Sequence, residues 1–141
     1  MSTDERWNYL VQLDDDLLKG GVMTSERSAF LMRNADLAFV HEAHLASLLT
    51  AVAAIESHLR GEYPDGGSRL VDLIDSSELE PELKAELNVI RRFRNTWVHV
   101  EAPWDDSTLL ENPEQSEKEL FEMARRSLIA LRKTVYSNPF I

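Results

Sequence analysis

The chain of 141 residues contains no cysteine, which excludes both a disulfide framework and a thiolate metal site. No apolar run approaches the length of a membrane span; the richest segment, Leu45–Ile55, is about as long as a core helix. The first residues show no basic start followed by an apolar stretch, so we expect no secretory signal. These absences predict a protein of the reducing cytoplasm with no membrane association.

Basic residues are scarce, because 15 Lys and Arg face 25 Asp and Glu, which gives a formal net charge of −10. Such an acidic chain does not coat nucleic acid non-specifically, since that mode needs many phosphate-neutralising cations. A role on RNA must therefore depend on a local cationic site. One such cluster exists, formed by Arg91, Arg92 and Arg94.

Helix-breaking residues are few, with five prolines and five glycines in the whole chain. They leave three uninterrupted stretches, 22–60, 82–102 and 114–138, which are far longer than typical strands. No segment alternates with period two over β-branched residues. At 43% hydrophobic, the chain can also bury a core. We therefore predict one all-α domain over residues 1–141.

The apolar spacing predicts a bundle of four or five helices. Gly20 and Gly21 should end the first of them. Ser77 with Glu80 has the spacing of a capping box, and Pro81 suits a first helical turn. Asn112 and Pro113 should open the last helix in the same way. Apart from the long helix described next, the expected helices cover about Asp4–Lys19, 69–74, 82–100 and 114–138.

The stretch after Thr24 or Ser25, either of which can cap a helix, predicts one long helix reaching Arg60. The alternative is a break at 34–36. Continuity is favoured because Phe30 stays in phase with the later members of the apolar stripe. That stripe is Phe30, Leu37, His41, His44, Leu48, Val52, Ile55 and Leu59.

The helix expected over 82–100 contains an anomaly at Arg94. With residues placed about 100° apart, Arg94 falls at the centre of the apolar side that contains Leu87 and Ile90. A guanidinium stays charged, so its burial needs a carboxylate or other acceptors. One interpretation is a structural Arg94 paired with Glu56. The other is a functional set, because Asn95 and His99 lie on the flank of the same stripe.

The segment Arg94-Asn95-x-x-x-His99, on a helix that follows a long apolar helix, resembles the HEPN superfamily. The hallmark of that family is Arg, four to six residues, then His, often with Asn directly after the Arg. Residues 54–60, which include Glu56, are similar to the acidic position late in the family's long helix. The likeness covers about residues 25–137, and the Arg–Asn–His piece is its specific part.

The resemblance implies a helical bundle, commonly dimeric, and a metal-independent endoribonuclease of a toxin–antitoxin, anti-phage defence or RNA-processing system. By motif position His99 would be the acid/base residue, Arg94 the phosphate binder and Asn95 a polar group that orients or contacts the substrate. The expected partners are an RNA substrate, a second copy of the chain, and an antitoxin or defence-system partner. No cofactor and no metal are expected.

One position departs from the family pattern. HEPN toxins that are silenced by nucleotidyltransferase partners often have Tyr two residues after the His, where this chain has Glu101. The departure argues against an antitoxin that acts by AMPylation. Some HEPN domains also lack catalysis and serve as binding modules, so the alternative function is a silent interaction module in a larger assembly.

His41-Glu42-Ala43-His44 is similar to a zinc-protease helix, but its histidines are three residues apart instead of four. We expect both to be hydrogen-bonded core histidines, since both fall on the apolar stripe.

Three further groups have competing interpretations. Residues 14–16, all Asp, should form a solvated face, because they lack the glycine of a calcium loop. The basic pairs 125–126 and 132–133 are either solvent-exposed or extend a phosphate track. Trp104, after the motif, either stacks on a base or packs against the bundle. Arg91 and Trp104 are therefore supporting candidates, together with Glu56.

Overall fold

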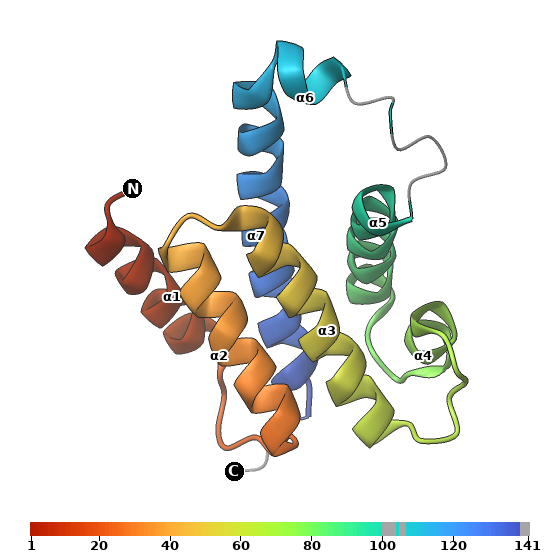
Figure 1. Ribbon diagram of the computed structural model, residues 1–141. Helices are drawn as coiled ribbons and strands as arrows, with labels where there is room; N and C mark the ends of the chain where they lie inside the picture. Colours follow the sequence, from red (N-terminus) through yellow and green to blue (C-terminus); the bar gives the residue numbers. More distant parts are fainter. Residues whose placement is uncertain (100–103, 105–106, 139–141) are drawn as a thin grey trace.

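A computed structural model describes residues 1–99, 104 and 107–138 of the chain, and that part contains helices and no β-strand (Figure 1). The all-α prediction is therefore confirmed. The structure has more helices than the four or five expected, because the long helix expected up to Arg60 is divided into two and because the short helix over Ser107–Glu111 was not expected. The helices are α1 (Thr3–Leu17), α2 (Glu26–Val40), α3 (His44–Glu62), α4 (Leu70–Ser76), α5 (Pro81–Val98), α6 (Ser107–Glu111) and α7 (Pro113–Val135).

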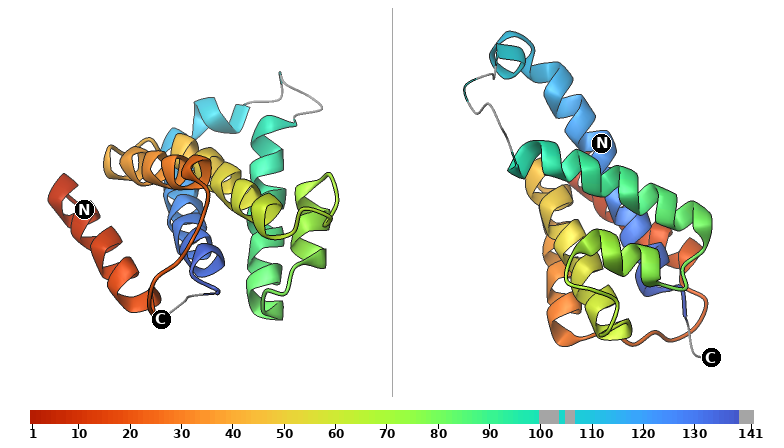
Figure 2. Two further views of the ribbon diagram at one scale, coloured as in Figure 1. Left: turned by 90° about the horizontal axis from the view of Figure 1, so that it is seen from below. Right: turned by 90° about the vertical axis from the view of Figure 1, so that its right-hand side faces the viewer.

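The helices pack around a central pair, α3 and α7, which contact one another over much of their length. Helices α1 and α2 cover one side of this pair, and α4 and α5 lie on the other (Figure 2). Helices α5 and α7 run in opposite directions, so the first turns of α5 and the last turns of α7 lie at the same end of the molecule (Figure 1). The opposite end contains the last turn of α5, α6 and the first turns of α7.

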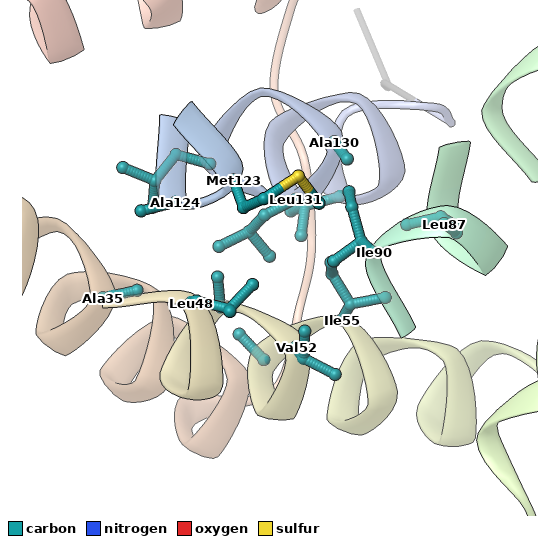
Figure 3. Packing of buried hydrophobic residues seen from close by; sticks show 14 of the residues in the cluster. Ala35, Leu48, Val52, Ile55, Leu87, Ile90, Met123, Ala124, Ala130 and Leu131 are labelled. Atoms are coloured by element: carbon teal, nitrogen blue, oxygen red, sulfur yellow. The ribbon is translucent and has the colours of Figure 1, made fainter. Parts of the chain in front are cut away.

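The core lies between α2, α3, α5 and α7, where aliphatic side chains from the four helices interdigitate (Figure 3). The stripe expected on the last helix is confirmed, because each of its members is buried. Those members are Leu120, Ala124, Leu128, Leu131 and Val135. Three other helices each contribute side chains to the same cluster, among them Ala35 of α2, Leu48 of α3 and Ile90 of α5 (Figure 3).

The prediction of one continuous helix up to Arg60 is wrong, because the chain turns between α2 and α3. Glu42 adopts a left-handed backbone with φ of 62°, which no helix continues through. Arg6 of α1 stabilises this turn: its Nε donates to the Val40 carbonyl at 2.6 Å, and its Nη1 contacts the Glu42 carboxylate at 3.1 Å. The prediction of continuity depended on Phe30 being part of the buried apolar stripe, but that residue is 64% exposed.

The predicted helix starts are partly confirmed. Ser25 caps α2 by accepting from the backbone N–H of Ser28 at 3.0 Å, and the Asn112 side chain caps α7 with Pro113 in its first turn. The predicted capping box of Ser77 with Glu80 does not form. Ser77 is the C-terminal cap of α4, its hydroxyl donating to the Ile74 carbonyl, because α4 ends where the box would begin.

A fully buried arginine, Arg132 of α7, joins three helices. Its guanidinium binds both carboxylate oxygens of Asp36 in α2, and its Nε donates to Asp14 in α1 at 2.9 Å. Burial, together with the neighbouring Asp14 carboxylate, raises the pKa of the Tyr136 phenol, which stays protonated and donates to Asp14. Asp15 and Asp16 are exposed, as predicted for a solvated face, and Asp14, whose side chain is 41% exposed, is in addition an ion-pair partner of Arg132.

Within the ranges given above, no helix is long and apolar enough to cross a membrane.

Candidate active site

The motif residues lie together at the C-terminal end of α5. Arg94 and Asn95 belong to its last turns, and His99 is the residue that caps the helix. The Nε of Arg94 donates to the Asn95 side-chain oxygen at 2.9 Å, while the Asn95 carbonyl accepts from the His99 backbone N–H at 2.9 Å. The Asn95 side chain thus orients the Arg94 guanidinium, and the backbone bond is the last helical bond of α5. Arg94 and Asn95 are half-buried and His99 is exposed, so all three are accessible to a ligand.

The predicted structural pair between Arg94 and Glu56 does not form. The Glu56 carboxylate accepts instead from Arg60, one helical turn later in α3, at 3.0 Å. Arg94 forms no ion pair with a carboxylate of the described residues, and its guanidinium is only half-buried. Arg94 therefore lies at the edge of the core and keeps donor groups available, while Glu56 pairs with Arg60 and does not neutralise Arg94.

The α5 arginines differ in their surroundings from those of α7. Arg91 donates to the Asn88 side chain at 3.2 Å, Arg92 is exposed, and neither is ion-paired within the part of the chain that the structure covers. The α7 arginines all have carboxylate partners: Arg125 with Glu122, Arg126 with Glu86, and Arg132 with two aspartates. Ion pairing therefore makes the three arginines of α7 less available to a phosphate than those of α5, while Lys133 is exposed and has no ion pair in the described part of the chain.

Exposed apolar side chains surround the motif end of the molecule. Trp104 is 92% exposed, so the alternative that it packs against the bundle is wrong. Val98, Leu109 and Leu110 are exposed as well. Helix α6 and the first turns of α7 extend beyond the other helices at this end (Figure 1). Val98 lies in the last turn of α5 beside the motif, whereas Leu109 and Leu110 lie in α6, which contacts α7 and not α5.

The histidine pair of residues 41 and 44 occupies the α2–α3 turn rather than one helix face. His41 is exposed, so its prediction as a core histidine is wrong. His44 is half-buried, with its ring 5.1 Å from that of Phe121 in an edge-on contact, but its Nδ1 has no hydrogen-bond partner among the described residues, so the prediction of a hydrogen-bonded histidine is wrong here as well. Burial lowers the pKa of His44. Among residues 1–99, 104 and 107–138, no three His, Asp or Glu side chains lie close enough together to hold a metal ion.

A third histidine, His58, was not predicted to have a role from the sequence. It lies in a cluster of hydroxyl groups between α2 and α3. The Nδ1 of His58 lies 2.8 Å from the Thr24 hydroxyl, and burial lowers the pKa of the imidazole. Beside it the Ser28 hydroxyl donates to Ser57 at 2.9 Å. These bonds join the start of α2 to α3. Their partners lie about thirty residues apart in sequence, so no local pattern indicates them.

Comparison with known proteins finds no match: no family model, no curated protein and no solved structure is similar to this chain.

Proposed function

We propose that this chain is a metal-independent endoribonuclease of the HEPN type, acting in a toxin–antitoxin or anti-phage system. One observation carries the proposal: Arg94, Asn95 and His99 lie together at an accessible helix end, and Arg94 has no carboxylate partner among the described residues. A purely structural arginine would be expected to resemble Arg132, fully buried between aspartates.

The residue types suit transesterification of RNA. The 2′-hydroxyl gives its proton to a base, its oxygen attacks the adjacent phosphorus, and the bond from phosphorus to the 5′-oxygen breaks as that oxygen takes up a proton. His99 is the residue type that most often transfers such protons. Arg94 stabilises the charge that develops on the phosphate, as a fixed guanidinium does well. Asn95 holds Arg94 and contacts the substrate.

A homodimer completes this mechanism. A single site has one imidazole, whereas the reaction needs both a base and an acid, and a second copy supplies the other His99 if the two motif ends meet. The exposed Val98 in the last turn of α5 and the exposed Leu109 and Leu110 of α6 support an interface at this end, because covering them in a dimer would remove their apolar surface from water. Two copies would also bring together six α5 arginines, Arg91 among them, which offsets the acidic character of the chain.

The alternative function, a catalytically silent interaction module, rests on the net charge of −10, which opposes binding to RNA. In that case the motif end binds a protein partner, and Trp104 anchors it instead of stacking on a base.

The two functions are separated by incubating the purified protein with single-stranded RNA, tRNA and single-stranded DNA in excess EDTA. The proposal predicts cleavage of RNA to products with a 2′,3′-cyclic phosphate and a free 5′-hydroxyl, with DNA left intact because it lacks the nucleophile. Expression should also slow growth. Intact RNA combined with normal growth would contradict the proposal and favour the silent module.

A further inference from the structure

An open groove with a volume of about 580 Å³ lies at the end of the molecule opposite the candidate active site. One side is formed by the first turns of α5 and the residues just before it, and the other by the last turns of α7. Leu79 and Leu83 line it from the α5 side, and Ile129 lines it from α7. Leu83 and Ile129 are only partly buried, so the floor of the groove is apolar and accessible.

The rim of the groove is acidic. Glu78, Glu80 and Glu82 line it and are exposed, and none of them is ion-paired within the described part of the chain. Glu86, deeper on the α5 side, is neutralised by Arg126. Lys133 is the one basic residue that lines the groove. The surface therefore combines an apolar floor with a net negative rim.

We infer that this groove binds a basic amphipathic segment of another protein. Aliphatic side chains on one face of such a segment would contact Leu83 and Ile129, while its Lys or Arg side chains would reach Glu78, Glu80 and Glu82. Charge complementarity of this kind selects the partner and steers its approach. A second copy of this chain fits poorly, because its own net charge is −10.

The dimensions suit a short helical segment. The α7 wall, residues 129–135, corresponds to about two turns, or about 10 Å of helix, which a partner helix of two to three turns would match. From Glu82 to Arg94 along α5 the rise is about 18 Å. A partner in the groove therefore leaves the motif end uncovered, and its binding does not depend on the proposed ribonuclease activity.

Binding is tested with a fluorescein-labelled 18-residue peptide of Leu and Lys, with Leu at helical spacing, and with a scrambled peptide of the same composition. The groove variant is Glu78→Gln/Glu80→Gln/Glu82→Gln. Its control, Glu114→Gln/Glu117→Gln/Glu119→Gln on the exposed first turns of α7, changes the net charge equally. Fluorescence anisotropy gives the affinities, and amide chemical shifts locate the peptide.

The inference predicts that the groove variant weakens binding about tenfold, the combined effect of three exposed ion pairs, while the control changes it less than about twofold. Lys133→Gln should strengthen binding, and shift changes should concentrate at residues 78–83 and 129–133. Equal weakening by the two variants, or equal affinity of the scrambled peptide, would show non-specific charge attraction and overturn the inference. So would a change in oligomeric mass confined to the groove variant, which would make a second copy the occupant.

Discussion

The Arg132 guanidinium binds Asp36 through two parallel contacts, 3.0 Å from Oδ1 and 2.8 Å from Oδ2, and so joins α7 to α2 inside the protein. A buried guanidinium cannot lose its charge, and removal of one partner of such a pair leaves that charge uncompensated. The stability of the three-helix junction therefore depends on both members of the pair.

Asp36→Asn should lower the free energy of unfolding by about 3 kcal/mol, the lower end of the usual range, because Asp14 still contacts Arg132. Glu122→Gln makes the same carboxylate-to-amide change in the exposed pair with Arg125 and should cost about 1 kcal/mol or less. Urea unfolding measures both. Equal unfolding midpoints for the two variants would contradict the role assigned to Asp36.

This junction also shows where prediction from the sequence succeeded and where it failed. The apolar stripe of α7 was predicted correctly because it follows from local spacing alone. Arg132 lies four residues after Leu128 and three before Val135, so it falls within that stripe just as Arg94 falls within the stripe of α5. The spacing therefore predicts burial for both arginines. Arg132 is buried and has two carboxylate partners, whereas Arg94 is half-buried and has none among the described residues.

Two features of the fold were not predicted because they depend on contacts between residues far apart in the sequence. The α2–α3 turn contains neither glycine nor proline, and Arg6, more than thirty residues earlier, provides its side-chain contacts. The cluster of His58 with Thr24 likewise depends on the packing of two helices. For the candidate site, the sequence placed Arg94, Asn95 and His99 on one helix end. The pair of Glu56 with Arg60 had a local signal, because the two residues are four apart on one helix, a spacing that favours an ion pair.

The α2–α3 turn provides a second stability prediction. Glu42→Ala and Glu42→Gly both remove the contact with Arg6, but only glycine adopts the left-handed conformation without steric cost. Glu42→Gly should therefore be more stable than Glu42→Ala by about 1 kcal/mol in urea unfolding. A less stable glycine variant would show that the left-handed conformation carries no strain.

Stability should fall on acidification through the ordinary histidine pKa. Burial lowers the pKa of His58 below the ordinary histidine value of 6.5 in the folded protein, so the unfolded chain binds a proton first as the pH falls. The stabilisation that neutral His58 contributes to the folded protein is therefore present above the ordinary histidine pKa and is lost as the pH falls below it. His58→Gln should flatten the change in urea midpoint between about pH 7.5 and about pH 5.5. His41→Gln, at an exposed position, should leave the change as it is.

The proposed dimer predicts a light-scattering mass of twice the 16.1 kDa of the chain at micromolar concentration. Leu110→Asp, at the motif end, should shift the protein towards monomer by placing a charge in the interface. Met23→Asp makes the same kind of change at an exposed site before α2 and should not. A monomeric wild-type protein would contradict a composite active site.

The central claim is tested most directly by the rate of RNA cleavage in EDTA for variants of the motif. His99→Ala and Arg94→Ala should each lower the rate by about 10²-fold or more, the scale of losing a proton-transfer or charge-stabilising group. Both should unfold close to the wild-type midpoint, since neither side chain is fully buried. The matched controls His41→Ala and Arg33→Ala, both exposed on or beside α2, should keep the activity. Cleavage that persists in His99→Ala, or a loss that the controls share, would contradict this account.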